Sequence, residues 1–225
     1  MNKILLETVK LQKKYDHKNG VIELFESVNI KIKRGELVAL VGPSGSGKSS
    51  FLHLLALLDN PTKGKILLNN KDTRNLSEEE KNLKRRNDIS IIFQDNNLLT
   101  DFTALENVIM PLIIKGENTD IATEKAKKLL KDVKILNRIN HFPNELSGGE
   151  QQRVAIARAL ISETNLILAD EPTGNLDYKT SEDIFSYFLK LKKLNKAIIF
   201  ATHNRELANR ADYKLSISKG HIKRV

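Results

Sequence analysis

Apolar and polar positions follow two periods along the chain, and the change between them predicts the order of its elements. Over residues 1–40, apolar residues gather in short runs typical of β-strands: ILLETVKL from residue 4, VIELFESVNIKI from residue 21 and ELVALV from residue 36. A glycine-rich loop and the helical stretch KSSFLHLLALL follow, and a turn at NPTKG leads to another strand, KILLN. We therefore expect a β-rich entry that continues into an α/β unit.

The middle of the chain is predicted to be helical, because three capping boxes mark helix starts. In a capping box a Ser or Thr side chain bonds an amide three residues on, and a Glu at that position bonds back. The three pairs are Ser77 with Glu80, Thr103 with Glu106, and Ser147 with Glu150. Between the first two, the apolar strand ISIIFQDNN runs into a polar loop, and helical periodicity returns in ATEKAKKLLKDV and from 148 to about 162.

The last third of the chain alternates strands with helices. The runs are LILAD, SEDIFSYFLKLKKL, AIIFAT, RELANRA and KLSIS, with a final turn at KG. Such alternation predicts an α/β fold, in which helices cover the faces of a parallel sheet. Because no fixed-period repeat or flexible linker interrupts the chain, we expect one domain over residues 1–225, with a helical subdomain inserted at about 95–162.

Composition narrows the classes of function. The apolar runs FLHLLALL and VIMPLII are far shorter than the ~20 residues that span a bilayer, and no signal-peptide pattern opens the chain, so we expect a soluble protein. The absence of Cys excludes disulfides, zinc–thiolate sites and thiol catalysis, and it fits a reducing cytoplasm. The formal net charge is +9, but the basic clusters at 31–34, 81–86 and 125–134 lack interleaved aromatic residues. We therefore do not expect nucleic-acid binding.

The segment GPSGSGKS, from Gly42 to Ser49, matches the phosphate-loop pattern. Its glycines let backbone N–H groups turn inward onto phosphates, Lys48 reaches the β and γ oxygens, and the Ser49 hydroxyl binds Mg²⁺. A strand before the loop and a helix after it supply the context that this motif requires. The predicted nucleotide-binding residues are Gly42, Pro43, Ser44, Gly45, Ser46, Gly47, Lys48, Ser49 and Ser50.

Two acids end the apolar strand in LILADE. Ligands of open α/β sheets lie outside the carboxyl ends of the strands, so we expect Asp170 and Glu171 to point toward the phosphate loop. Asp170 is suited to hold the Mg²⁺ shell, and Glu171 to act as the base that polarises the attacking water. The alternative is that either acid only caps the turn at Pro172.

Three further side chains are candidates for the same site. His203 follows the apolar strand in FATHN, where a neutral imidazole could bond the γ-phosphate and hold the water and Glu171 in place. Gln94, after SIIF, offers an amide oxygen to Mg²⁺ or water, and Tyr15, before the DHKNG turn, could stack on an adenine. For His203 the alternative is a structural turn residue.

A second anion-binding pattern stands at LSGGEQQRVAIARAL, residues 146–160. Ser147, Gly148 and Gly149 at a helix start present free N–H groups and the positive end of the helix dipole. The alternative is helix capping by Ser147 with Glu150. Capping needs no pair of glycines, and glycine disfavours a helix by ~1 kcal/mol, so the pair indicates close approach of another group to the backbone.

Together these motifs resemble the ABC ATPases over essentially the whole chain. The phosphate loop at 42–49, Gln94, LSGGEQ at 146–151, LILADE at 166–171, NLD at 175–177 and His203 stand in the order and spacing of that family. The resemblance implies a P-loop fold of the ABC type, with an N-terminal antiparallel β subdomain, a mostly parallel sheet core and an inserted α-helical subdomain. It also implies hydrolysis of ATP with Mg²⁺ as cofactor.

The resemblance also implies a homodimer, because ABC ATPases bind ATP between two subunits arranged head to tail. The phosphate loop of one chain would face the LSGGE segment of the other, which would explain two anion-binding patterns in one chain. Asp177 would lie at the contact between the halves, and Tyr15 matches the adenine-stacking position.

Within the family, LLTDFTALENVIMPLI at 98–113 and LADEPTGNLD at 168–177 resemble the ATPases of lipoprotein-releasing systems. Such ATPases sit at the cytoplasmic side of the bacterial inner membrane and drive integral membrane subunits that pass lipoproteins to a periplasmic carrier. The related ATPases of macrolide exporters and of cell division are the alternatives. Soluble ABC proteins that act on ribosomes or DNA usually carry two ATPase halves or a long coiled coil, and a phosphate-loop kinase has no use for LSGGE.

Two places depart from the lipoprotein-releasing pattern. Asp95, Asn96 and Asn97 replace the aromatic and His residues that often follow the glutamine, in a loop expected to touch the membrane partner. Asn204 stands where an Asp commonly follows the His, which should leave hydrolysis intact. The apolar run VIMPLII has two interpretations: the core of the helical insertion, or the edge of a groove for a partner's helix.

Overall fold

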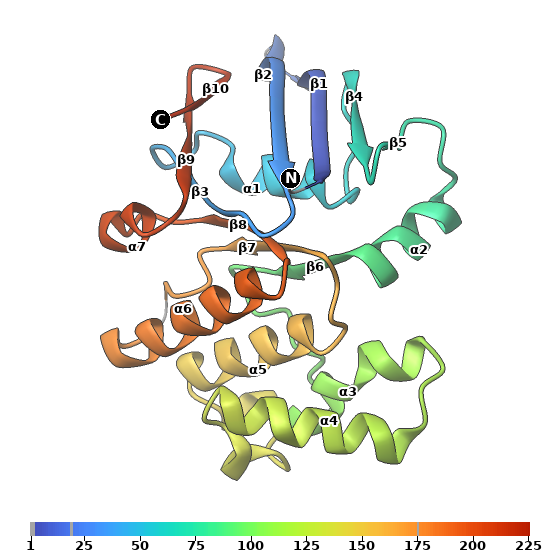
Figure 1. The fold of residues 1–225 in the computed structure, drawn as a ribbon, viewed down its shortest axis with the longest axis vertical. Coiled ribbons are helices and arrows are strands. Elements are labelled where there is room, and N and C mark those ends of the chain that lie inside the picture. Colours follow the sequence, from blue (N-terminus) through green and yellow to red (C-terminus); the bar gives the residue numbers. More distant parts are fainter. Residues whose placement is uncertain (1–2, 19, 175) are drawn as a thin grey trace.

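Two sheets organise the part of the chain that the computed structural model describes, residues 3–18, 20–174 and 176–225. Figure 1 shows the smaller sheet at the top, the larger sheet across the middle and most of the helices below. The α/β fold predicted from the alternation of strands and helices is confirmed.

The smaller sheet is antiparallel and has the order β2-β1-β4-β5. Its strands are β1 (Ile4–His17), β2 (Gly20–Lys33), β4 (Lys63–Leu68) and β5 (Lys71–Asp72). β1 and β2 form a hairpin at the predicted turn. On β2 the side chains of Val28, Ile30 and Ile32 are buried, because alternate residues of a strand point to the same face.

The larger sheet has the order β10-β9-β3-β8-β7-β6 and is parallel except for β10, which pairs antiparallel with β9. Its strands are β3 (Leu37–Val41), β6 (Ile89–Ile92), β7 (Leu166–Asp170), β8 (Ala197–Ala201), β9 (Tyr213–Ser218) and β10 (His221–Arg224). Every residue of β7 and β8 is buried. Continuous burial is typical of parallel strands that are covered on both faces.

Three of the helices begin where the capping boxes predict. The α-helices are α1 (Lys48–Leu55), α2 (Glu78–Asp88), α3 (Ala104–Ile114), α4 (Thr119–Asp132), α5 (Gly148–Leu160), α6 (Tyr178–Lys193) and α7 (Arg205–Asn209). Short 3-10 turns lie at Leu136–Arg138 and Pro143–Glu145. All three predicted capping boxes have both of their hydrogen bonds. Among the described helices, none is long and apolar enough to cross a membrane.

The core has two parts, one on each face of the larger sheet. Alternate residues of β3 divide between them: Val38 and Leu40 pack with α1 and the smaller sheet, while Leu37 and Ala39 pack with the helices on the other face. That second face is covered by α3 to α6, as Figure 1 shows. The sheet is therefore held between two apolar layers, and its strand ends are left to form sites.

Several elements differ from the sequence prediction in their ends or were not predicted at all. α1 ends at Leu55 rather than near residue 58, because Leu57 takes a left-handed φ of 58° that a helix cannot continue. α6 begins three residues before the predicted run, since the Asp177 carboxylate caps it. The short edge strands β5 and β10 were not predicted, because strands of two and four residues carry too few positions to show a period.

Candidate active site

A cleft of about 330 Å³ opens at the carboxyl ends of β3, β6, β7 and β8. It brings together side chains that the sequence predicted from four separate segments. Its lining residues are Leu24, Ser44, Gly45, Gly47, Lys48, Ser49, Ser50, Gln94, Asp170, Glu171 and His203. Gly42 and Pro43 line a neighbouring cleft of about 500 Å³, together with His203 and Asn204.

Leu24 is a lining residue that the sequence analysis missed. It lies on β2, in the other sheet, and only folding brings it over the phosphate loop. A Cβ added at Gly47 would lie 2.9 Å from Leu24 Cδ1, and Gly47 has a φ of 93°. No period or motif marks Leu24, so no sequence signal pointed to it.

The start of α1 is free to bind an anion. Gly47 is its N-cap residue and supplies no side-chain hydrogen bond, so the N–H groups of the first turn face the cleft without an intrachain cap. Gly42 is also constrained, because an added Cβ would lie 2.9 Å from the Ile217 carbonyl oxygen. The glycines thus permit the tight loop that brings these amides together.

Lys48 is buried at the base of the cleft. Its Nζ donates to the carbonyl oxygens of Gly42 at 3.1 Å and Pro43 at 3.2 Å, and it lies 3.1 Å from His203 Nε2. A lysine ammonium is only a donor, so in this contact His203 Nε2 can serve only as the acceptor. The cation therefore stands where phosphate oxygens would meet the loop.

Glu171 places a carboxylate beside this cation. Its Oε2 accepts from the His203 backbone N–H at 3.4 Å, and its Oε1 lies 3.4 Å from His203 Nε2. Oε1 is buried and has no hydrogen-bond partner among the described residues. Burial raises the pKa of Glu171 above its usual value, while the bond from the His203 backbone N–H and the positive charge of Lys48 act in the opposite direction. The carboxylate is therefore available for a proton from a group in the cleft.

The backbone of Glu171 is also unusual. Its φ of 45° is left-handed, and its N–H donates to the Ala201 carbonyl at 3.1 Å. The carboxylate bonds to His203 across the cleft, and within the described chain it makes no bond to the turn at Pro172. The turn-capping alternative for Glu171 is thus not what the geometry shows.

Oxygen donors that suit Mg²⁺ line the same cleft. They are the Ser49 hydroxyl, the Gln94 amide oxygen and the carboxylate of Asp170, which is 8% exposed at the end of β7. Hard oxygen ligands are those that Mg²⁺ prefers, usually with phosphate oxygens and water completing the shell. No group of three His, Cys, Asp or Glu residues in the described chain could hold a metal by itself. These donors therefore fit a metal that arrives with a phosphate ligand.

Tyr15 lies outside the cleft lining. Its hydroxyl donates to Asp59 Oδ2 at 2.7 Å, and Lys13 Nζ lies 4.5 Å from its ring centroid. Burial and the Asp59 carboxylate raise the pKa of Tyr15 to about 12. Tyr15 is 40% exposed, and its stacking role stays a prediction.

Ser147 and Gly148 of the LSGGE segment are exposed at the start of α5, and the segment contributes no described residue to the cleft lining. Ser147 and Glu150 form the capping box, and the Arg138 Nε donates to Glu150 at 3.0 Å. Bonds from Ser147 and Arg138 hold the pKa of Glu150 down to about 2. A Cβ added at Gly148 would meet nothing within 4 Å. Capping explains Ser147 and Glu150, but packing within this chain does not explain Gly148.

Asp177 is linked to α5 by hydrogen bonds that run through Thr180. Its carboxylate accepts from the Thr180 N–H at 3.0 Å and the Thr180 hydroxyl at 2.6 Å. Arg153 of α5 donates to the same hydroxyl at 3.3 Å. Asn175, in the NLD motif, lies outside the described residues.

One of the departures from the lipoprotein-releasing pattern has a structural role, and the loop at the other is held through its backbone. Asn204 caps α7 by accepting from the N–H groups of Glu206 and Leu207, a role that Asp fills equally well. Arg158 of α5 donates to the carbonyl oxygens of Asn97 at 2.7 Å and Asn96 at 2.8 Å. Because these bonds use the backbone, the loop after Gln94 keeps its support whatever the side chains are.

Some residues of the run VIMPLII are buried in the core, and others line a groove, so each of the two interpretations holds for part of it. Val108 and Leu112 of α3 are buried in the core. Met110, Pro111 and Ile114 instead line a groove of about 460 Å³, together with Phe93, Leu99 and Arg158. One helix thus provides both core and groove edge.

Comparisons with known proteins agree with this geometry. The sequence model of the ABC transporter family matches residues 25–174. A lipoprotein-releasing system ATP-binding protein LolD from Rickettsia bellii is 49% identical over 218 residues, covering 95% of this chain and 96% of the relative. LolD from Legionella pneumophila (strain Lens) is 43% identical over 223 residues, covering 99% and 98%. The dimeric bacterial ABC transporter cassette MJ0796 superposes with a TM-score of 0.95 at 38% identity and covers 98% of both chains. Its post-hydrolysis state bound to ADP and Pi also gives 0.95, at 37% identity.

Proposed function

This chain belongs to the ABC transporter family and is an ATPase, and on that premise we propose that it drives a membrane complex that releases lipoproteins. Relatives named LolD align over nearly its whole length, which supports this substrate class over a macrolide exporter or a cell-division complex. The proposed place of the chain is the cytoplasmic side of the inner membrane, as a peripheral subunit bound to integral membrane partners.

The half-buried carboxylate of Glu171 carries the hydrolytic part of the proposal. It lies in the phosphate-loop cleft with one oxygen unpartnered among the described residues. In hydrolysis the oxygen of water bonds to the γ-phosphorus, the bond from that phosphorus to the bridging oxygen breaks, and ADP leaves. Glu171 accepts the proton of the water, and His203 orients both groups.

The phosphate loop supplies binding and charge. The N–H groups at the start of α1 and the Lys48 ammonium hold the phosphate oxygens. Mg²⁺, held by Ser49, Gln94 and Asp170, would neutralise charge on the phosphates. Nucleotide oxygens would replace the carbonyl and imidazole contacts that Lys48 makes in this structure.

We further propose that the LSGGE segment completes the site of a second copy of the chain. Gly148 is open toward solvent, so the N–H groups of this helix start can be approached from outside. The cleft of the same chain contains none of its described residues. The dimeric state of MJ0796 supports this arrangement. Asp177, linked to α5 through Thr180, would lie at the same contact.

The groove beside α3 is the proposed seat of a helix from the membrane partner. Leu99 is 42% exposed and Ile114 is 59% exposed, and both line it. An apolar groove at the loop after Gln94 lets a partner's movement reach the nucleotide cleft through Arg158, which holds that loop.

Release of a lipoprotein from proteoliposomes to a soluble acceptor tests the proposed substrate class. The wild-type chain, reconstituted with its membrane subunits, should release lipoprotein only with ATP, and a Glu171→Gln chain should release none. If ATP is hydrolysed but the complex moves a macrolide and no lipoprotein, the exporter alternative replaces the proposal.

A further inference from the structure

The groove beside α3 combines an apolar surface with positive charge. Three arginines line it, Arg85 and Arg86 of α2 and Arg158 of α5, and no Asp or Glu of the described chain is in its lining. The large apolar residues of the lining are Ile89, Ile91, Phe93, Leu99, Met110, Pro111 and Ile114. An occupant that offered only apolar side chains would cover these cations without supplying a counter-charge.

Arg158 is already engaged within the chain. Its guanidinium donates to the carbonyl oxygens of Asn96 at 2.8 Å and Asn97 at 2.7 Å, and it lies 3.5 Å from the Asn107 amide oxygen. These partners are neutral, and burial lowers the pKa of Arg158. Because its bonds hold the loop after Gln94, Arg158 supports the groove wall and is not the cation that a partner meets first.

Arg86 is the arginine that is open to a partner. It is exposed on α2, and its one bond to a described residue runs from Nη1 to the Ile114 carbonyl oxygen at 3.4 Å. Arg85, by contrast, is half-buried, donates to the Leu57 carbonyl oxygen and has the Glu78 carboxylate 4.0 Å away. A guanidinium has five N–H donors, so Arg86 keeps donors for another molecule beside the end of α3.

The acids of α2 that form ion pairs are committed to lysines. Glu78 pairs with Lys81 at 2.6 Å, and Asp88 pairs with Lys84 at 3.1 Å. Neither carboxylate bonds to Arg86 among the described residues. The helix that carries Arg86 therefore does not neutralise it.

The acids of the loop before α3 lie toward the other end of that helix. This loop contains Asp95 and Asp101, and its Leu99 N–H donates to the Asn107 amide oxygen at 2.8 Å. Ile114, which Arg86 contacts, follows Asn107 by about 10 Å of helix, at 1.5 Å per residue. Neither acid is in the groove lining. The guanidinium of Arg86 is thus separated from both.

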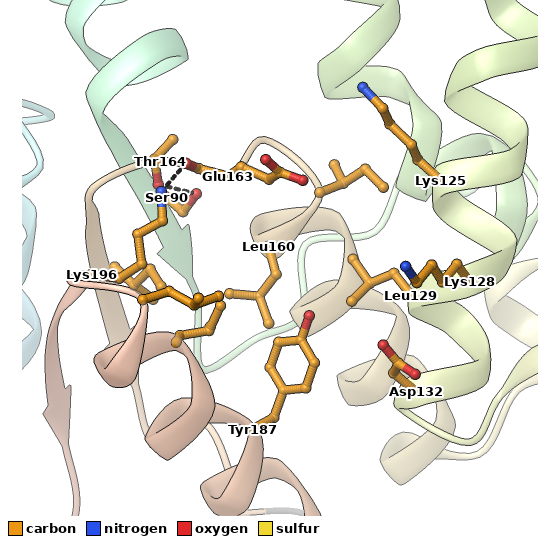
Figure 2. Close-up of a pocket in the computed structure, with 14 residues that line it drawn as sticks. Ser90, Lys125, Lys128, Leu129, Asp132, Leu160, Glu163, Thr164, Tyr187 and Lys196 are labelled. Atoms are coloured by element: carbon orange, nitrogen blue, oxygen red, sulfur yellow. Dashed lines mark hydrogen bonds between the residues drawn. The ribbon is translucent and has the colours of Figure 1, made fainter.

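Lys115 adds positive charge at the same end of α3. Burial lowers the pKa of Lys115 and the charge of Arg86 lowers it further, while Glu117 and Glu163 act in the opposite direction. Glu117 pairs with Lys125, and Glu163 lines another cavity at the amino ends of the strands (Figure 2). Even with Glu163 counted against Lys115, the charge of Arg86 is left in excess.

We propose that the partner helix seated in this groove carries an acidic residue that pairs with Arg86, an inference that rests on the proposed docking of such a helix. Because Arg86 bonds to the carbonyl of Ile114, the acid lies within one turn of the apolar residue that covers Ile114. A guanidinium and a carboxylate pair through two parallel hydrogen bonds, which fix direction as well as position. The acid therefore sets the orientation of the partner helix in the groove.

Charge reversal at Arg86 tests the proposal in the complex. Membrane subunits held in nanodiscs are titrated with the chain, and the affinity is measured at low and at high salt. Arg86→Glu should weaken the association at least about tenfold at low salt, because one charge-assisted pair is lost and repulsion replaces it. Lys128→Glu is the control and should bind as the wild-type chain does, because Lys128 is an exposed residue of α4 outside the groove lining.

A reciprocal exchange identifies the acid. Each Asp or Glu of the cytoplasmic helices of the membrane subunits is replaced in turn by Lys, and one replacement should restore the binding of Arg86→Glu. Arg86→Gln should bind more weakly than wild type and lose most of the salt dependence. Wild-type affinity in Arg86→Glu, or no replacement that restores it, would overturn the proposal. Unfolding curves of the isolated variants establish that each is folded.

Ile114→Gln separates the pairing with Arg86 from the docking of the helix. This variant removes an apolar contact and keeps the charge of Arg86. If Ile114→Gln loses binding and Arg86→Glu keeps it, a helix occupies the groove without the acid, and only the pairing is refuted. If both bind as wild type does, the partner docks elsewhere and both proposals fail.

Discussion

At the scale of single residues, Glu171 combines three unfavourable features. Its backbone is left-handed, its carboxylate is largely removed from water, and one carboxylate oxygen lacks a partner among the described residues. Each feature costs folding free energy for a non-glycine, ionisable residue. The proposed role of Glu171 as the group that accepts a proton would explain why the fold retains all three features at the phosphate-loop cleft.

The first prediction concerns activity. Glu171→Gln keeps the size and polarity of the side chain but cannot accept a proton, so ATP hydrolysis should fall at least about 100-fold. ATP binding should persist, because Lys48 and the amides of α1 are untouched. Phosphate release and nucleotide binding measure the two effects. Glu124→Gln, on the exposed face of α4, is the control and should hydrolyse ATP normally; near-normal turnover in Glu171→Gln would refute the assignment.

The second prediction concerns stability. Because burial raises the pKa of Glu171 in the folded chain, ionisation there opposes folding at every pH above that raised value. Glu171→Gln should therefore unfold at a higher temperature than wild type at pH 7 to 8. The difference should shrink as pH falls, and vanish below the ordinary carboxylate pKa of 4.5, where the unfolded chain is protonated too. A less stable Glu171→Gln at pH 7 would contradict this linkage.

Motif spacing could predict most of the cleft at this scale. Lys48, Glu171 and His203 each follow an apolar strand, and parallel strands end at one edge, so their meeting was accessible from the sequence. The place of Leu24 in the cleft could not be predicted from the sequence, since Leu24 lies on β2 in the other sheet. Nor could the contact between Lys48 and His203, which depends on side-chain conformation.

At the scale of elements, the starts of α1 and α5 differ in how they are capped and in what they face. α1 has a glycine N-cap and opens into the cleft of its own chain, whereas α5 is capped by Ser147 and opens to solvent. Both starts present N–H groups and the positive end of a helix dipole. Because Gly148 leaves the first turn of α5 open, a group of another molecule can approach the N–H groups there.

The third prediction separates folding from association. Gly148→Ala should leave the stability of the monomer unchanged or raise it by up to about 0.5 kcal/mol, since the new Cβ meets nothing and alanine favours helix. The same methyl group should weaken ATP-dependent dimerisation and hydrolysis, because it blocks approach to the backbone. Urea unfolding and sedimentation velocity measure the two effects. Unchanged dimerisation would mean that nothing closely approaches Gly148.

Capping boxes were the most informative signal for elements. Ser77, Thr103 and Ser147 each begin a helix within one residue of the predicted point, because the cap is a local interaction that sequence alone specifies. The end of α1 was set instead by the backbone of Leu57, and the pairing of β10 with β9 depends on a neighbour in space.

At the scale of the whole molecule, the candidate functional residues lie on three surfaces. The nucleotide cleft, the start of α5 and the groove beside α3 are lined by separate described residues, but α5 connects them. Arg158 near its end holds the loop after Gln94, and Arg153 contacts the segment that Asp177 begins. Sequence spacing could predict each surface, but not that α5 would line the groove through Arg158 and hold the loop beside the nucleotide cleft with the same side chain.

The fourth prediction concerns docking. Ile114→Glu places a charge in the apolar groove and should abolish co-purification with the membrane subunits, while the isolated chain still hydrolyses ATP. Leu83→Glu is the control, because Leu83 is 46% exposed on α2 and lies outside the groove lining. If both variants bind the membrane subunits as wild type does, the partner docks elsewhere.

The most direct test of the central claim, that each ATP site is shared between two chains, is a mixing experiment with two inactive variants. Lys48→Ala disables the phosphate loop, and Gly148→Arg blocks the LSGGE segment. Random pairing makes half of the dimers mixed, each with one intact site of two, so mixing should restore about a quarter of wild-type hydrolysis. Mixing Lys48→Ala with Glu171→Gln should restore none, because both residues line the same cleft and no intact site results. No recovery in the first mixture, or full activity in Gly148→Arg alone, would contradict the shared site.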